Sequence, residues 1–226
     1  MPTETPSRLE GHWTLDEVSG QRLDSSGQGN HLADNNTVGS WVGQVSLAAD
    51  FESSNSEYLS ISDAAQNGLD ITGSLTLVGW VNPERVGRGQ VIAAKYDWGN
   101  NNRAYRLDLR RDNAVGLLVS PNGSYSSEYL LEASPPFSLS AGTWYHVAGV
   151  FDAEGRTLSV YVDGELIGSR TVSYDRIYNS LASFTLGASL SNGSGVQYFD
   201  GRIDEWRVYR RALSESEIEN LMAASP

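Results

Sequence analysis

The chain contains no cysteine. Its 226 residues can therefore form neither a disulfide bond nor a thiolate metal site, and a bound metal would have to be held by oxygen atoms or by the three histidines. Oxygen ligands suit hard cations, and calcium accepts about six to eight of them in proteins. Calcium is thus the first metal to consider for this sequence.

Basic residues are also scarce. The chain has 16 Lys and Arg against 28 Asp and Glu, which gives a formal net charge of −12. Nucleic-acid binding requires clustered Lys and Arg, so a nucleic-acid partner is not expected, and anionic membranes are disfavoured for the same reason. Apolar runs of 18 or more residues are absent, so membrane insertion is not expected.

No interruption typical of a linker occurs between Gly11 and Tyr209. We therefore predict one domain over residues 11–224, because 226 residues with 39% hydrophobic content fit one large β domain. The polar, proline-containing residues 1–10 lack the apolar core of a secretion signal and are predicted to be a linker or its remnant. This predicts covalently linked neighbouring domains in a longer chain.

Helical patterns are rare in the sequence. Only the C-terminal segment is predicted to be helical, with Ser214 and Glu217 forming a capping box. Elsewhere, short segments rich in β-branched and aromatic residues lie between Gly, Asn, Asp and Ser, as in strands. We predict strands over Ser74–Val81, Arg103–Arg110, Ala114–Val119, Trp144–Phe151, Thr157–Gly164 and Ser183–Ala188. The strand Thr157–Gly164 is predicted to be shared by two consecutive hairpins within Trp144–Ile167. This pattern predicts an all-β fold, a two-sheet antiparallel β-sandwich or jelly roll with a short C-terminal helix.

Four sequence blocks resemble the laminin G-like, concanavalin A-like lectin and glucanase family of jelly rolls. They occur in the family's order and read "GHWTLDEVSGQRLDSSGQGNH" (Gly11–His31), "GSLTLVGWV" (Gly73–Val81), "GTWYHVAGVFDAEGRTLSVYVDGELIG" (Gly142–Gly168) and "FDGRIDEWRVYRRALSESEI" (Phe199–Ile218). The resemblance implies two antiparallel sheets and often a bound calcium. It does not fix a function, since the family includes carbohydrate-binding modules, adhesion domains, pentraxins and glycoside hydrolases.

The resemblance implies where a calcium would lie. In the family a calcium commonly joins the early loop to an acid of the last strand, which here implicates Asp24, Asn30 and Asp204, with Asp16 or Glu17 as an addition. Strict alternation along the last strand places Asp204 on one face with Trp206 and Val208, so a buried carboxylate there would need a partner. The alternative is that Asp24 caps a turn and Asp204 accepts hydrogen bonds from a neighbouring strand or an arginine.

Catalytic motifs are weak. The sequence has no strand with the paired carboxylates of a retaining glycosidase and no nucleophile elbow, zinc-protease or phosphate-loop motif. Asp108 in "RLDLRRD" is predicted to form salt links with arginines, and His146 to be a structural histidine. His12 and His31 show no evident acidic or nucleophilic partner. Glu215, Glu217 and Glu219 fall on the C-terminal helix, where acids near the N-terminus favour the helix dipole.

Three predicted loops mix aromatic and polar residues, as sugar sites do, because a sugar presents an apolar C–H face and a rim of hydroxyls. Candidate ring platforms are Tyr96, Trp98, Tyr125, Tyr129, Tyr174 and Tyr178. Candidate polar contacts are Asn101, Asn102, Arg106, Asp108, Asp175 and Arg176. Trp98 is the preferred stacking ring because its neighbours predict exposure, whereas Trp80, Trp144 and Trp206 lie in apolar strands and are predicted to be buried. The alternative is that these aromatic residues cover the sandwich edges.

These patterns predict a non-catalytic, calcium-stabilised carbohydrate-binding module of a secreted or cell-surface multidomain protein, in which it could accompany a polysaccharide-degrading enzyme. The acidic composition favours a neutral glycan over a sulfated or uronic one. Two alternatives stay open: an adhesion domain that binds a protein, and a divergent glycoside hydrolase.

Overall fold

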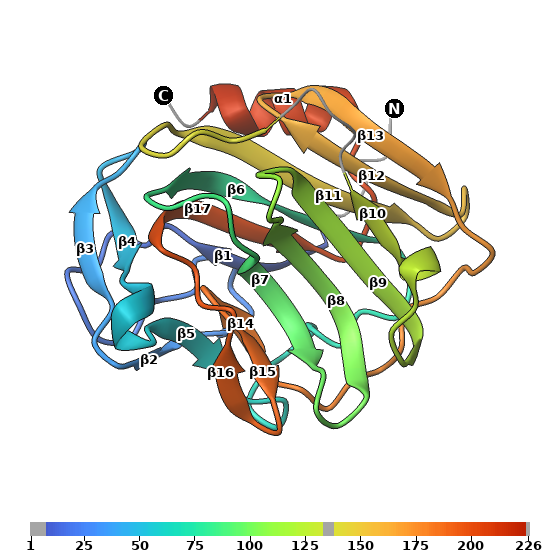
Figure 1. The fold of residues 1–226 in the computed structure, drawn as a ribbon, viewed down its shortest axis with the longest axis horizontal. Helices are drawn as coiled ribbons and strands as arrows, with labels where there is room; N and C mark the ends of the chain where they lie inside the picture. Colours follow the sequence, from blue (N-terminus) through green and yellow to red (C-terminus); the bar gives the residue numbers. More distant parts are fainter. Residues whose placement is uncertain (1–7, 133–137, 225–226) are drawn as a thin grey trace.

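The computed structural model describes residues 8–132 and 138–224, except for the side chains of Glu128 and Glu132. Two antiparallel sheets pack face to face, and one short helix lies outside them (Figure 1). The predicted β-sandwich with a C-terminal helix is confirmed. No helix in these residues is long and apolar enough to span a membrane.

The first sheet has eight strands in the order β13-β12-β11-β6-β17-β4-β3, with β1 paired to β17. Its strands are β1 (Leu9–Trp13), β3 (Gly39–Val42), β4 (Leu47–Phe51), β6 (Leu75–Pro83), β11 (Tyr145–Asp152), β12 (Thr157–Val162), β13 (Glu165–Thr171) and β17 (Gly201–Tyr209). The two predicted hairpins are confirmed as β11–β12 and β12–β13. The predicted linker ended too late, because Leu9 already pairs with Tyr209 as part of β1 and Glu10 lies at the irregularity that follows in the same strand.

The second sheet has nine strands in the order β10-β9-β8-β7-β14-β5-β2, with the β15–β16 hairpin beside β7. Its strands are β2 (Ala33–Asn35), β5 (Tyr58–Ile61), β7 (Gln90–Asp97), β8 (Asn102–Leu109), β9 (Val115–Gly123), β10 (Leu130–Glu132), β14 (Phe184–Leu186), β15 (Ser189–Ser191) and β16 (Ser194–Val196). Short 3-10 helices cover Ser53–Asn55 and Ser127–Tyr129.

One apolar cluster fills the space between the sheets. The alternation of side chains along each strand directs apolar residues into this cluster. Along β12, for example, buried Leu158, Val160 and Val162 alternate with partly exposed residues. Trp13 lies at its centre, stacked on Phe184 with ring centroids 5.3 Å apart.

The predicted burial of the strand tryptophans is right for two of three. Trp206 is fully buried in the core, and Trp80 is buried outside the core cluster. The prediction is wrong for Trp144, which is only half-buried because it precedes β11 at the sandwich end.

A β-bulge in β17 changes which face Asp204 occupies. The register against β6 shifts between Asp204 and Arg207, and Glu205 has a φ of 51°. Ile203 and Trp206 consequently both reach the core, so Asp204 does not share a face with Trp206 as strict alternation predicted.

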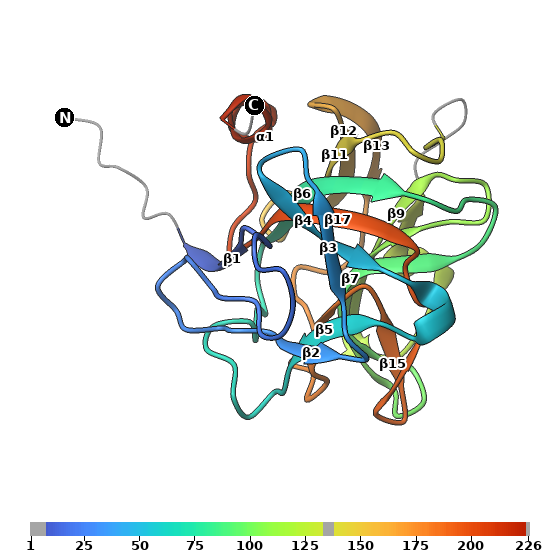
Figure 2. The same ribbon diagram turned by 90° about the vertical axis from the view of Figure 1, so that its left-hand side faces the viewer.

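Helix α1 (Glu215–Ala223) covers part of the outer face of the eight-stranded sheet, on the side away from β5 and β15 (Figure 2). Its buried Ile218 packs in an apolar cluster with Val78, Ala148 and Tyr209 from three strands. The predicted capping box is confirmed, since Ser214 and Glu217 exchange both hydrogen bonds. Glu217 also forms an ion pair with Arg211 at 2.8 Å.

Candidate functional site

On the outer face of the nine-stranded sheet, polar side chains lie next to a small apolar cluster. Ala94, Arg106 and Leu118 lie opposite one another on β7, β8 and β9, so their side chains share one face. That face is not the core face, because Ala94 and Leu118 belong to an apolar cluster separate from the core. Strand β8 therefore presents Arg106 and Asp108 on the outside of the sandwich.

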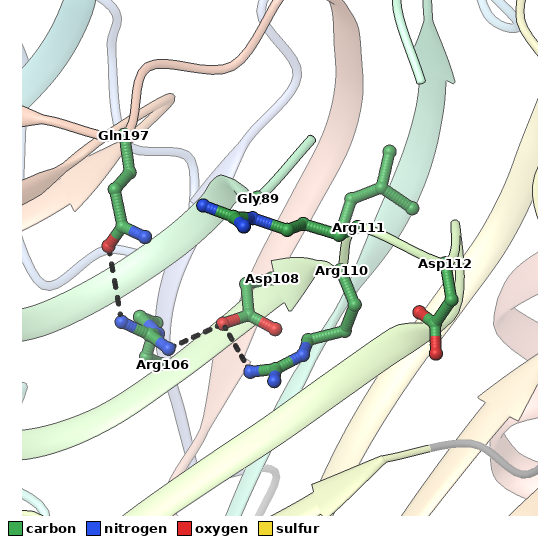
Figure 3. Close-up of a pocket in the computed structure, with 8 residues that line it drawn as sticks. Gly89, Arg106, Asp108, Arg110, Arg111, Asp112 and Gln197 are labelled. Carbon is green, nitrogen blue, oxygen red and sulfur yellow. Dashed lines mark hydrogen bonds and ion pairs between the residues drawn. The ribbon is translucent and has the colours of Figure 1, made fainter. Parts of the chain in front are cut away.

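Arg106 and Asp108 form a buried ion pair on this face. Arg106 Nη2 lies 2.7 Å from Asp108 Oδ2, Arg106 Nη1 donates to Gln197 Oε1 at 3.4 Å, and Arg110 lies 3.9 Å from the same carboxylate. Figure 3 shows Arg106 between Gln197 and Asp108. The predicted salt links of Asp108 with arginines are confirmed. Gly116 makes room for them, since a Cβ there would lie 2.6 Å from Asp108 Oδ1.

Arg103 reaches the same face through a bulge. The register shifts between Arg103 and Tyr105, and both Ala104 and Tyr105 point into the core. The Arg103 guanidinium donates to Tyr96 Oη at 3.1 Å, to Asn101 Oδ1 at 2.5 Å, and to backbone carbonyls at 2.7 and 3.2 Å. All these acceptors are neutral. It also lies over the Tyr96 ring, as does Arg106, at 5.5 and 4.8 Å from the centroid.

Two hollows meet at Arg106 and Gln197. One, of about 420 Å³, is lined by Tyr96, Trp98, Arg103, Arg106, Tyr125 and Gln197. The other, of about 320 Å³, is lined by Gly89, Arg106, Asp108, Leu109, Arg110, Arg111, Asp112 and Gln197. We call the two together the outer-face groove. Trp98 and Tyr125 form an exposed aromatic wall, at 50% and 54% exposure.

Five of the twelve predicted ligand residues meet in this groove: Tyr96, Trp98, Arg106, Asp108 and Tyr125. The predicted exposure of Trp98 is confirmed. It is not the only tryptophan in this state, because Trp41 on β3 is 56% exposed. Tyr96 lies beneath the two guanidinium groups and is buried, so it supports the groove instead of offering a free ring face.

The other predicted ligand residues do not line the groove. Tyr174 packs on Phe151 in the core and donates to the Val119 carbonyl, and burial raises its pKa above the usual range. Tyr129 packs edge-on against Tyr174. The remaining side chains lie outside the groove as well: Asn101 bonds Arg103, Asn102 bonds the backbone of Leu181, Tyr178 lies against Gly123, Asp175 pairs with Arg156, and Arg176 is exposed.

Sequence reasoning missed seven groove residues: Gly89, Arg103, Leu109, Arg110, Arg111, Asp112 and Gln197. Strict alternation along β8 separates Arg103 from Arg106, and only the bulge unites them. Gln197 comes from the segment after β16 and has a φ of 54°, which no local motif indicated. The pair of arginines in "RLDLRRD" was the available signal for Arg110 and Arg111.

Two of the predicted calcium ligands, Asp24 and Asn30, are hydrogen-bonded to neighbouring residues. Asp24 accepts four hydrogen bonds, from the backbone of His12, Ser26 and Asn30 and from the Ser26 hydroxyl. Burial acts to raise the pKa of Asp24, but these hydrogen bonds together outweigh burial, so the pKa of Asp24 lies below its usual value. The Asn30 amide likewise bonds Glu10 and Asn67.

Asp204 and Asp16 accept hydrogen bonds from a different segment, residues 45–47. Asp204 Oδ2 accepts from Val45 at 2.8 Å, and Asp16 accepts from Leu47 at 3.0 Å. Among the described residues, no three His, Asp or Glu side chains gather as metal ligands. Asp24 already accepts four hydrogen bonds, whereas Asp204 Oδ1 is buried without a hydrogen-bond partner among the described residues, and calcium binding stays a prediction.

One of the three histidines differs from the sequence prediction. His12 has an acidic partner after all, since its Nε2 lies 2.8 Å from Glu205, and this pair links β1 to β17 in addition to their strand pairing. His31 Nδ1 accepts from the Asp24 backbone. His146 is buried with its ring edge against Trp80, and burial, assisted by Arg207, lowers its pKa to about 4. Burial raises the pKa of Asp204 to about 7.

A family model of the concanavalin A-like lectin/glucanases superfamily matches residues 53–219. The chain belongs to this superfamily. The non-toxic nonhemagglutinin of Paraclostridium bifermentans is 24% identical over 217 residues, which cover 93% of this chain and 16% of that protein. The chain thus spans less than a fifth of that curated relative.

Solved structures share the fold. The binding domain of Paraclostridial Mosquitocidal Protein 1 superposes with a TM-score of 0.74 at 17% identity, covering 96% of this chain and 52% of that one. Domain 4 of AbnA, an extracellular arabinanase from Geobacillus stearothermophilus, was solved in complex with arabinotriose. It superposes with a TM-score of 0.68 at 21% identity, covering 95% of this chain and 98% of that one.

Proposed function

We propose that this chain is a non-catalytic carbohydrate-binding module and that the outer-face groove is its binding site. The observation that carries the proposal is the pairing of two exposed rings, Trp98 and Tyr125, with fixed guanidinium and amide groups in one groove. A ring stacks on the apolar face of a pyranose, and the polar groups bond its hydroxyls. Three strands and a hairpin hold these groups in place.

The similar proteins support this proposal. The arabinanase domain has nearly the same extent as this chain and was crystallised with a trisaccharide, and the mosquitocidal-protein structure is a binding domain. The curated relative is several times longer than this chain. We therefore also propose that the chain works as one part of a secreted multidomain protein.

The absence of catalysis is part of the proposal. A glycosidase needs one carboxylate free to protonate and a second to attack or activate water. Asp108, the carboxylate at the centre of the groove, is instead held by Arg106 and Arg110. Release of reducing ends from β-glucan, xylan, galactan or arabinan that is lost on changing Asp108 would contradict this part.

Protein binding is the second candidate function, favoured by one observation. Edge strand β3 exposes Trp41 and Val42, at 56% and 69%. An edge strand has unpaired backbone groups that can pair with another chain. The Trp41 ring is partly used, however, since Arg202 lies 5.2 Å from its centroid.

A matched pair of variants separates the two candidates. A glycan array first identifies ligands of the wild-type chain, and calorimetric titration then compares Trp98→Ala with Trp41→Ala. We expect Trp98→Ala to weaken glycan binding severalfold with Tm nearly unchanged, because a surface ring contributes little to stability. Trp41→Ala should leave glycan binding intact. Glycan binding that ignores Trp98 contradicts the proposed site, and an empty array with a protein ligand lost in Trp41→Ala favours the second candidate.

A further inference from the structure

We infer that the outer-face groove selects glycans that carry a carboxylate on the sugar, held by Arg103 and Arg106. This inference rests on the proposed carbohydrate function and specifies its substrate class. It also departs from the preference for neutral glycans that the overall composition suggested, because the groove and the whole chain have opposite charge.

Arg103 is a buried cation without a counter-ion. Only 7% of the residue is exposed, and its partners are a phenol, an amide and two backbone carbonyls. None of the carboxylates that the structure describes lies within ion-pair distance of it. Buried charges in proteins are ordinarily paired, because removing them from water is costly. An anion in the hollow that Arg103 lines would supply the missing charge.

Arg106 is the second cation of the hollow and is incompletely satisfied. Its Nη2 is paired with Asp108 and its Nη1 makes a long bond to Gln197, but its buried Nε finds no acceptor among residues 8–132 and 138–224. Both guanidinium groups lie over the same Tyr96 ring. The ring and the neutral acceptors hold the two cations in place along one hollow, so little side-chain entropy is lost when an anion binds.

The charge of the groove is opposite to that of the molecule. Its ionisable side chains are four arginines, Arg103, Arg106, Arg110 and Arg111, and two acids, Asp108 and Asp112, whereas the chain as a whole carries −12. The hollow beside Trp98 has arginines and no acid. A cleft of one sign concentrates the opposite charge. Guanidinium groups match carboxylates in planar, two-point hydrogen bonds, and the adjoining Trp98 and Tyr125 suit the ring that bears the carboxylate.

Two pairs of probes test this inference, each pair differing in the carboxylate. Trigalacturonate is compared with its fully methyl-esterified form, and 3′-sialyllactose with lactose, by calorimetric titration of the wild-type chain at low and at physiological salt. We expect at least one acidic probe to bind tenfold or more tightly than its neutral partner, with a smaller ratio at higher salt because screening weakens charge pairing.

Arginine variants then locate the effect. Arg103→Gln should abolish the preference for the acidic probe, and Arg103→Lys should retain part of it. The double variant Arg106→Gln/Asp108→Asn removes the second cation without leaving a buried carboxylate alone, and should also reduce the preference. Arg156→Gln is the control, since it removes the same charge from an exposed ion pair with Asp175 outside the groove. Melting curves confirm that each variant is folded.

The outcomes separate this inference from the proposed function. If neutral partners bind as tightly as acidic ones and Trp98→Ala weakens both, the groove binds sugars but the inference is overturned. If an acidic preference persists in every folded arginine variant, the inference is overturned as well. If neither these probes nor any array glycan binds, the proposed function fails together with it.

Discussion

The two sheets of the sandwich expose very different outer faces. The eight-stranded sheet is covered by α1, whose Ile218 is completely buried against Val78 and Ala148. Among residues 8–132 and 138–224, no α-helix covers β7, β8 and β9 of the nine-stranded sheet, where Arg103, Arg106 and Trp98 line a groove. The outer face of the eight-stranded sheet is closed by apolar packing. The outer face of the nine-stranded sheet stays open and presents arginine and aromatic side chains that can contact a ligand. We place stability on the first face and ligand binding on the second.

Removal of the helix contact should give the largest loss of stability. Ile218→Ala removes a completely buried side chain, which typically costs about 2–5 kcal/mol. Alanine is the better helix former, so the loss would report packing and not helix propensity. Chemical denaturation measures it, with Asn220→Ala on the exposed side of α1 as the control. Glycan binding by the folded fraction should not change; a loss below about 1 kcal/mol would contradict the assigned cover.

His146 should make this face sensitive to pH. Its pKa of about 4 in the folded chain lies below the unfolded value near 6.5, so the unfolded chain binds more protons between these values. Stability from His146 is complete above pH 6.5 and is lost as pH falls towards 4, by about 3 kcal/mol. Asp204, with a pKa near 7, contributes the opposite slope.

The His146→Gln variant isolates the histidine. The Asp204 contribution is common to both proteins and cancels in the difference of their unfolding free energies. Measured by denaturation from pH 4 to 7.5, the advantage of the wild-type chain should shrink as pH falls. A difference that is constant over this range would show that His146 is not held neutral by burial.

Calcium should have the smallest effect on stability. Calcium at the early loop would have to displace hydrogen bonds that Asp24 already accepts, so its net gain is expected to be below about 1 kcal/mol. Thermal melting in chelator and in millimolar calcium measures this gain, with Asp24→Asn as the variant. A large fall of Tm in chelator that calcium reverses would show that the loop rearranges around a metal.

The sequence was informative where its patterns are local. Gly, Asp and Asn at the turns, β-branched and aromatic residues between them and the Ser214 capping box predicted the sandwich and its helix, and the polar neighbours of Trp98 predicted its exposure. These features depend on a few adjacent residues. They do not require knowledge of which strands pair.

The predictions that went wrong depended on distant pairing. Bulges at Glu205 and beside Arg103 break the alternation, so Asp204 left the Trp206 face and Arg103 joined Arg106. Gln197 reaches the groove from a segment far along the chain from Arg106. Tyr174 does lie in a loop, between β13 and β14, but contact with Phe151 buries it.

The central claim is that glycans bind at the outer-face groove. The most direct measurement is a titration of the ¹⁵N-labelled wild-type chain with the tightest array glycan, followed through the indole N–H signals of its six tryptophans. Assignment by Trp98→Phe and Trp41→Phe identifies the two exposed rings. The account predicts that the Trp98 signal shifts and saturates with the calorimetric affinity while the Trp41 signal stays in place. A saturating shift at Trp41, with none at Trp98, would contradict it.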